Sequence, residues 1–138
     1  MKNLMSSNLS EFKGRIIICG SCIPGISRKT FEKIRRMSKN IFFVCLEEIH
    51  MNMAAHKIVS ILRKGNVKEI IFVTVDKSPH CVQLHYIRNE IEKIIKTREF
   101  EMKNFVISDN NLEEISPEMI SISKNLCKIK SLIKKQKR

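Results

Sequence analysis

The feature that most constrains the fold is a regular alternation of short, continuous apolar runs with longer segments of helical periodicity. The apolar runs cover residues 15–19, 41–46, 69–75 and 103–107. Continuous runs of this length are typical of strands that are buried on both faces. After each run, apolar residues recur at helical spacing. This order predicts an α/β fold, a Rossmann-like three-layer sandwich of about four parallel strands with helices on both faces.

Capping residues indicate where the helices begin and end. Ser27 and Ser78 are expected N-caps, and Gly65 supplies a left-handed residue that ends a helix without a Cβ penalty. Ser116, which a proline follows, is the expected N-cap of a last helix. The apolar residues between 115 and 133 recur in alternating steps of four and three. This spacing suits a helix laid on the sheet, or a helix that pairs with a second copy in a homo-oligomer.

Length and composition place the chain among globular proteins. With 138 residues and 43% hydrophobic residues, the chain is expected to form a single α/β domain over 1–138. Within it, 1–14 is expected to be a polar leader, and 124–138 the basic end of the C-terminal helix. Apolar runs of membrane-spanning or signal-peptide length are absent from the sequence, so we expect a cytoplasmic protein without a membrane partner. In that compartment five cysteines are expected as thiols or ligands rather than disulfides.

Cysteines follow the ends of three predicted strands. Cys19 and Cys22 close the first strand, Cys45 lies at the end of the second, and Cys81 follows the third. Ligands of doubly wound sheets bind outside the carboxyl ends of the strands, where the strand order reverses. If the first strand is central and the next two flank it, these thiols meet at one edge. We expect Cys81, in the first turn of a helix, to be the most reactive of them.

The cysteine pattern predicts a metal site that holds zinc or an iron–sulfur cluster. Cys19-x-x-Cys22 has the spacing that lets two thiolates point at one ion. A zinc site needs four ligands, or three and a water, whereas a cluster needs about four thiolates. The candidate ligands are Cys19, Cys22, Cys45, Cys81, His80 and His85.

A second interpretation concerns thiol catalysis. The segment Cys22-Ile-Pro-Gly-Ile-Ser-Arg28 fits Cys-x5-Arg between a strand and a helix, so it resembles the phosphate loop of tyrosine phosphatases and related arsenate reductases. The resemblance implies a thiol enzyme that acts on an oxyanion, with Cys22 as the nucleophile and Arg28 as the oxyanion-binding residue. Asp76, at the end of the third predicted strand, would be the general base of such an enzyme, and is otherwise a hydrogen-bond partner of a ligand or, as we favour, a turn residue.

Two further resemblances concern metal proteins. A cysteine that ends the first strand, with His80 and Cys81 after the third, looks like the zinc site of β-class carbonic anhydrases, which implies a zinc lyase. The stretch 74–85, together with Cys19-Gly-Ser-Cys22, resembles small uncharacterised α/β proteins of anaerobes that are labelled iron–sulfur or ferredoxin-like. That resemblance implies an accessory redox role with a redox protein partner.

Positive charge gives a last alternative. The formal net charge is +12, and residues 124–138 hold seven Lys and Arg residues with no acid. A basic module that binds nucleic acid is consistent with this charge. With one Tyr and no Trp the chain has few rings to stack on bases, so we favour a basic tail over a nucleic-acid partner.

Overall fold

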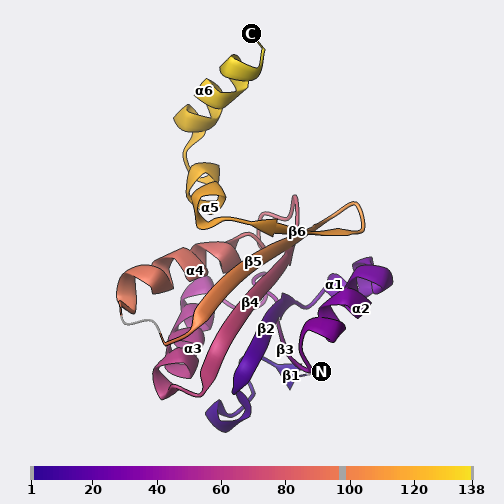
Figure 1. Ribbon diagram of the computed structural model, residues 1–138, viewed down its shortest axis with the longest axis vertical. Coiled ribbons are helices and arrows are strands. Elements are labelled where there is room, and N and C mark those ends of the chain that lie inside the picture. The colour runs from indigo at the N-terminus through magenta and orange to yellow at the C-terminus, as the bar shows by residue number, and fades with distance from the viewer. Residues whose placement is uncertain (1, 97–98, 138) are drawn as a thin grey trace.

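A six-stranded sheet organises the chain, shown as a computed structural model in Figure 1, in which residues 2–96 and 99–137 are described. The strands follow the order β1-β3-β2-β4-β5-β6 across the sheet. Their bounds are β1 (Lys2–Asn3), β2 (Gly14–Gly20), β3 (Asn40–Val44), β4 (Val67–Val75), β5 (Glu101–Ser108) and β6 (Asn111–Ile115). Neighbours pair in parallel from β1 to β5, and β6 pairs with β5 antiparallel. The predicted α/β class is therefore confirmed.

Helices connect the parallel strands. Their bounds are α1 (Ile23–Ile26), α2 (Arg28–Met37), α3 (Met51–Lys64), α4 (Gln83–Ile94), α5 (Pro117–Ser123) and α6 (Leu126–Gln136), with a 3-10 turn η1 (Leu9–Glu11) near the N-terminus. The caps expected at Ser27 and Ser116 are present, since each side chain accepts a backbone N–H bond in the first helical turn. Gly65 ends α3 with a left-handed φ of 84°.

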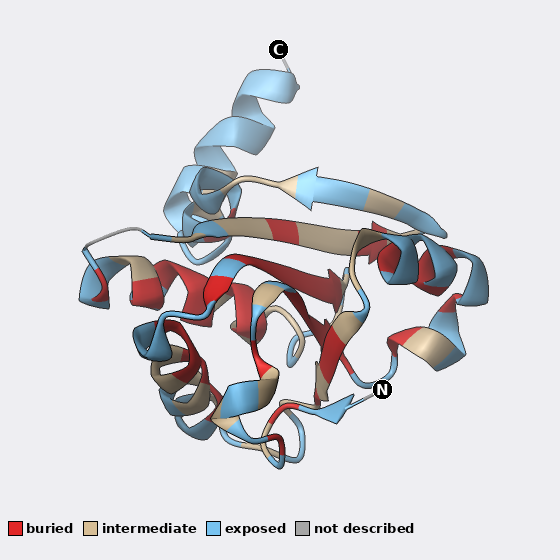
Figure 2. Cartoon of the chain, turned by 60° about the horizontal axis from the view of Figure 1, so that its bottom comes forward, coloured by how far each residue is buried: buried red, intermediate tan, exposed pale blue. Residues whose placement is uncertain are grey.

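The core lies on both faces of the central strands, because alternate residues of a strand point to opposite sides. Ile16 and Ile18 of β2 pack into a cluster that includes residues of α3 and α4. Ile17 and Cys19 pack into a second cluster with residues of α1 and α2. Figure 2 shows the buried residues concentrated in the middle of the sheet and on the helix faces turned toward it. This double burial explains why the strands read as continuous apolar runs.

Two strands were not predicted, and both extend the sheet at its edges. The first, β1, lies in the expected polar leader, and its neighbour Leu4 is fully buried, as is Phe12 with 1% exposure. The leader is thus partly core. The second, β6, follows a two-residue turn at Asp109 and Asn110, whose φ values of 48° and 66° are those of a tight hairpin turn.

The helix predicted after the third strand begins later than expected. The helix expected to begin at Ser78 begins at Gln83 instead, and residues 79–82 form turns. Ser78 still accepts a bond from the N–H of Cys81, at 3.2 Å, so it caps a turn rather than the helix. Cys81 consequently lies two residues before α4, which removes the first-turn placement on which its expected reactivity depended.

The last helix is divided and leaves the body of the protein. Asn125 is extended, and its side chain accepts a bond from the N–H of Lys128, so α6 starts anew after α5. On α5 Ile120 is buried, but no residue of α6 is. In Figure 1 α6 projects away from the sheet toward the C-terminus. The prediction of one continuous helix laid on the sheet is therefore wrong for α6.

Candidate functional site

The strand order reverses between β2 and β4, which are neighbours in the centre of the sheet. From β2 the chain passes through α2 to β3 on one side, and from β4 through α4 to β5 on the other. The loops after β2 and β4 therefore diverge at the carboxyl edge, as at a ligand-binding crevice of a doubly wound sheet. The expectation that the second and third predicted strands flank the first is confirmed.

Four cysteines lie at this edge, and we call them the thiol cluster: Cys19, Cys22, Cys45 and Cys81. Cys19 ends β2 and is fully buried, whereas Cys22 is exposed, and Cys45 and Cys81 are half-buried. Gly20 lies between the two cysteines of the Cys-x-x-Cys pair, and a third cysteine approaches it. A Cβ atom at this glycine would lie 3.4 Å from the Cys81 sulfur. The fifth cysteine, Cys127, is exposed on α6 and is not part of the cluster.

The thiols of the cluster influence one another electrostatically. Burial raises the pKa of Cys19, and the neighbouring Cys22 and Cys81 raise it further. Partial burial also raises the pKa of Cys22, as do the charge of Cys81, a hydrogen bond with its thiol, and the charge of Cys45. Thiols with raised pKa values are protonated at neutral pH and are poor nucleophiles. They become good ligands when a bound cation displaces their protons.

The two predicted histidine ligands occupy different places. His80 lies near the cluster on the loop after β4, and its Nδ1 is 3.2 Å from Oε1 of Glu47, on the loop after β3. Both side chains are at least half exposed, so this contact adds little stability but does join the two loops. Among residues 2–96 and 99–137, no three His, Cys, Asp or Glu side chains are already arranged to hold a metal ion.

His85 is a core residue and is not brought together with the cysteines. It is fully buried, and Nε2 lies 2.7 Å from Oγ1 of Thr74 while Nδ1 lies 3.0 Å from Oδ1 of Asn104. Both ring nitrogens are thus engaged with neighbouring strands, β4 and β5. Burial lowers the pKa of His85, although the bond to Asn104 opposes this shift. A neutral imidazole with two polar partners serves here to satisfy buried polar groups.

The Cys22–Arg28 segment does not form an open cradle for an oxyanion. The N–H groups of Gly25 and Ile26 donate to the carbonyl of Cys22, at 3.1 and 3.2 Å, and that of Ser27 donates to the carbonyl of Ile23, at 3.2 Å. These bonds form the short helix α1 and occupy amides that a phosphate loop would turn toward its ligand. Arg28 is exposed at the start of α2. The geometry therefore does not favour the phosphatase-like alternative.

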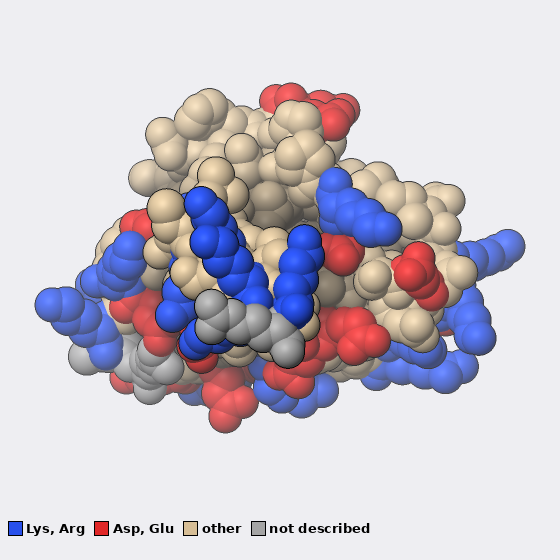
Figure 3. All heavy atoms as spheres, turned by 90° about the horizontal axis from the view of Figure 1, so that it is seen from above, with Lys and Arg blue, Asp and Glu red and all other residues tan. Residues whose placement is uncertain are grey.

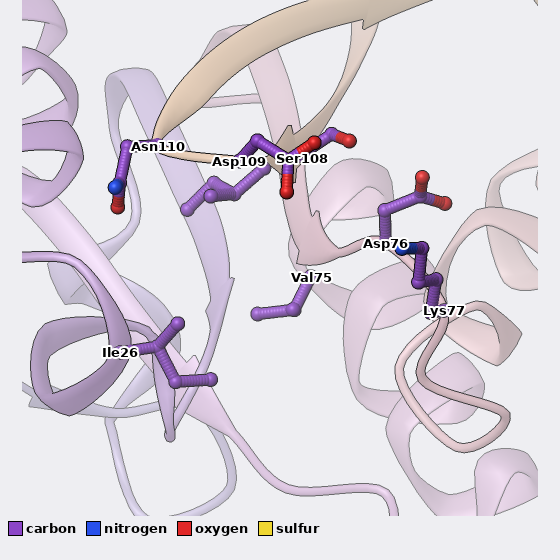
Figure 4. A pocket seen from close by; sticks show the side chains of 8 residues that line it. Ile26, Val75, Asp76, Lys77, Ser108, Asp109 and Asn110 are labelled. Atoms are coloured by element: carbon purple, nitrogen blue, oxygen red, sulfur yellow. The ribbon is translucent and has the colours of Figure 1, made fainter.

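Asp76 lines a small cavity whose other lining residues include no member of the thiol cluster. The cavity has a volume of about 240 Å³ and lies between α1 and the ends of β4 and β5. Figure 4 shows the apolar side chains of Ile26 and Val75 on one side of it and the polar turn 108–110 on the other. The backbone N–H of Asp76 donates to the carbonyl of Ile107, at 3.0 Å. Asp76 thus continues the β4–β5 pairing beyond the strand end.

The structure adds two residues to the site that sequence reasoning missed. The Cys81 sulfur approaches Gly20 closely, and Glu47 contacts His80 across two loops. A glycine that ends an apolar strand run was a visible signal for Gly20, because a glycine in a strand often marks the close approach of another group. No local signal points to Glu47, since its partner lies more than thirty residues away in the chain.

Comparisons with known proteins agree with this architecture. A family model described as a Rossmann-like domain matches residues 12–138. No curated protein matches the chain, and no solved structure does. The family description names neither a metal nor a reaction, so the resemblances to iron–sulfur proteins and β-class carbonic anhydrases stay predictions. In the described part of the chain, no helix has the length and apolar character needed to cross a membrane. The match covers most of the sequence, and the chain therefore belongs to the Rossmann-like domain family.

Proposed function

We propose that the thiol cluster binds a thiophilic metal centre, either zinc or an iron–sulfur cluster, at the carboxyl edge of the sheet. The observation that carries the proposal is the meeting of cysteines from three separate strand ends at the point where the strand order reverses. Cys19 lies near the end of β2, and Cys22 follows that strand, Cys45 follows β3 and Cys81 follows β4. Cysteine thiolates are the ligands that zinc and iron–sulfur centres prefer.

Electrostatics favour a cation over thiol catalysis at this site. Burial and the neighbouring thiols raise the pKa values of Cys19 and Cys22, so the site stabilises the protonated form of both. A catalytic cysteine needs the opposite environment, one that lowers its pKa. A bound metal ion supplies the missing positive charge and converts the same thiols into thiolate ligands.

Binding requires only local adjustment of the cluster. Cys22, Cys45 and Cys81 lie on loops or turns, whose side chains can turn toward a common ion. Cys19 is held in the strand and is the least adjustable ligand. Because structural zinc sites take four ligands, His80 is the candidate for a position that Cys19 does not fill.

Metal reconstitution of matched cysteine variants tests this function. Protein purified under reducing, oxygen-free conditions is loaded with zinc, or with iron and sulfide, and desalted, and the metal bound per chain is measured by elemental analysis and absorption. We expect about one zinc ion or one cluster per chain for the unaltered protein and for Cys127→Ser, whose thiol lies outside the cluster. Cys22→Ser and Cys81→Ser are expected to lower the metal affinity at least about tenfold.

Two outcomes would contradict the proposal. One is equal metal content in all four proteins, which would assign the metal to adventitious sites. The other is no stoichiometric metal in the unaltered, folded protein with either reagent. Iron and sulfide uptake would favour an electron-transfer role, whereas zinc uptake would favour a structural or Lewis-acid role.

A further inference from the structure

The helix α6 leaves an apolar surface uncovered. Leu126 is 78% exposed, Ile133 is 49% exposed and Leu132 is 41% exposed. An ordinary surface helix turns such side chains toward the core of its own domain. With eleven residues and a rise of about 1.5 Å per residue, α6 is about 16 Å long. The aliphatic residues therefore form a short stripe that the protein itself does not bury.

The opposite face of α6 is basic. At about 100° per residue, Leu126, Ile129, Leu132 and Ile133 fall on one arc of the helix. The lysines at 128, 130, 134 and 135 fall on the remaining arc, and Lys128 and Lys130 mark its two borders with the stripe. Residues 124–138 contain no acid. The helix thus combines an apolar stripe with lysines along both of its edges.

Contacts with α4 fix the position of α5 and Lys124, which directly precede α6. The side-chain amide of Asn89 on α4 donates to the carbonyl of Pro117 and to the hydroxyl of Ser121 on α5, at 3.3 and 3.2 Å. Next to the break at Asn125, the Lys124 ammonium lies 5.0 Å from the centre of the Tyr86 ring. From above the C-terminal end, Lys and Arg side chains project over the middle of the visible surface (Figure 3).

Charge and shape together select one class of partner. A second copy of the chain would bring the same lysines against these lysines, and a pair of eleven-residue helices buries far less than the roughly 1,200 Å² of a stable interface. Nucleic acid would neutralise the lysines but leave the aliphatic stripe in water. A surface with anionic headgroups above an apolar layer accommodates both faces at once.

We infer that α6 is an interfacial helix that lies on an anionic lipid surface. Leu126, Ile129, Leu132 and Ile133 enter the boundary between headgroups and acyl chains, and the lysines on both borders pair with acidic headgroups. Such a helix lies in the plane of the membrane and needs no spanning length. The inference departs from the expectation of no membrane partner, which was made from the absence of apolar runs of membrane-spanning or signal-peptide length. It is independent of the proposed metal site.

Vesicle co-sedimentation of the full chain tests the inference. The probes are vesicles of phosphatidylcholine mixed equally with phosphatidylglycerol, and vesicles of phosphatidylcholine alone. We expect binding to the anionic vesicles at least about tenfold stronger than to the neutral ones, and a loss of binding as salt is raised. Aliphatic side chains without aromatic anchors give weak binding by themselves, so both faces of the helix are needed.

Matched variants separate the two faces of α6. Leu132→Ser combined with Ile133→Ser should weaken binding about tenfold, while Met53→Ser, which removes an apolar side chain of 59% exposure on α3, should leave it unchanged. Lys128→Gln with Lys135→Gln should weaken binding similarly, whereas Lys29→Gln with Lys33→Gln on α2 should not. Because α6 buries no residue, these changes leave the fold intact, which circular dichroism verifies.

Three results would overturn the inference. Equal binding to neutral and anionic vesicles would show that the lysines do not contribute to binding. Binding of the Leu132→Ser, Ile133→Ser variant as strong as that of the unaltered chain would show that the apolar stripe does not contribute to binding. Tighter binding to an RNA oligonucleotide than to anionic vesicles, unaffected by that variant, would assign the basic face to nucleic acid instead.

Discussion

The carboxyl edge of the sheet and the C-terminal helix α6 both display side chains suited to binding, but they are supported very differently. The thiol cluster lies on loops that leave buried strands, and one of its members, Cys19, is itself part of the core. The helix α6 has no buried residue and depends on α5 for its position. The comparison teaches that the fold brings the thiols to one edge, although in the described part of the chain no three ligand side chains are already arranged around an ion, whereas α6 leaves its aliphatic side chains exposed.

The strongest test of this difference is the truncation of equivalent aliphatic residues in the two regions. Ile18→Ala, at a fully buried position of β2, is expected to lower the free energy of unfolding by about 2–5 kcal/mol, because it leaves a cavity in the core. Ile133→Ala, at 49% exposure on α6, is expected to change it by less than about 0.5 kcal/mol. Urea denaturation measures both. Similar losses would show that α6 contributes to the core after all.

A substitution of Gly20 tests the proposed metal site at the carboxyl edge without altering a cysteine. In Gly20→Val the γ-carbons would press on the Cys81 sulfur, since even a Cβ at this position lies 3.4 Å from it. We expect the metal affinity to fall about tenfold, or about 1.4 kcal/mol. A competition titration with a chromophoric chelator measures the affinity. The control is Gly25→Val, because a Cβ there meets no atom within 4 Å. Equal metal affinities of the two variants would show that Cys81 is not a ligand of the metal.

The boundary between α5 and α6 provides a third test, with a smaller effect. Asn125→Ala removes the side-chain acceptor of the Lys128 N–H and should destabilise the start of α6 by about 1 kcal/mol. Hydrogen exchange of residues 126–136 should accelerate while that of β2 and β4 is unchanged. Asn125→Ser keeps an acceptor and should behave like the unaltered chain. Faster exchange in the central strands would contradict the independence of the two regions.

The pH dependence of stability is expected to be the most gradual effect, and to arise in the core. Burial lowers the pKa of His85 in the folded protein, whereas in the unfolded chain it titrates near 6.5. The unfolded state therefore binds more protons just below that pH, so His85 contributes stability that is fully present above about pH 6.5 and is lost as the pH falls. A second loss begins below about 4.5, because bonds from Arg15 and Lys103 lower the pKa of Glu69 although burial opposes them.

Unfolding experiments between pH 7 and 5 measure the contribution of His85. His85→Gln should flatten the decrease of stability over this interval, while His56→Gln, at an exposed position of α3, should leave its slope unchanged. An unaltered slope in His85→Gln would show that another group is responsible.

The metal affinity of the carboxyl edge is also expected to depend on pH, through cysteine thiols rather than through a histidine. The pKa values of Cys19 and Cys22 are raised, so a metal must displace their protons. The affinity for zinc is therefore expected to increase between pH 6 and 8, with proton release detectable by calorimetry in two buffers. Binding without proton release would argue against thiolate ligands.

Part of this molecule was determined by the sequence alone. The apolar runs predicted β2 to β5, and Ser27, Gly65 and Ser116 predicted helix boundaries, because strand burial and capping are local properties. The approach of Cys22 to Cys81 was also predictable, since parallel strand order follows from chain connectivity.

Tertiary structure decided the rest. His85 has the spacing of a ligand to Cys81, yet its ring nitrogens bond Thr74 and Asn104 because packing of α4 turns that face toward β4 and β5. Leu4 and Phe12 became core residues because β1 pairs with the distant strand β3, and Phe12 packs against Phe42 of that strand in the same cluster. The exposure of α6 accompanies the break at Asn125, after which no residue of the helix is buried. Such outcomes depend on which distant residues meet, and a local pattern cannot contain that information.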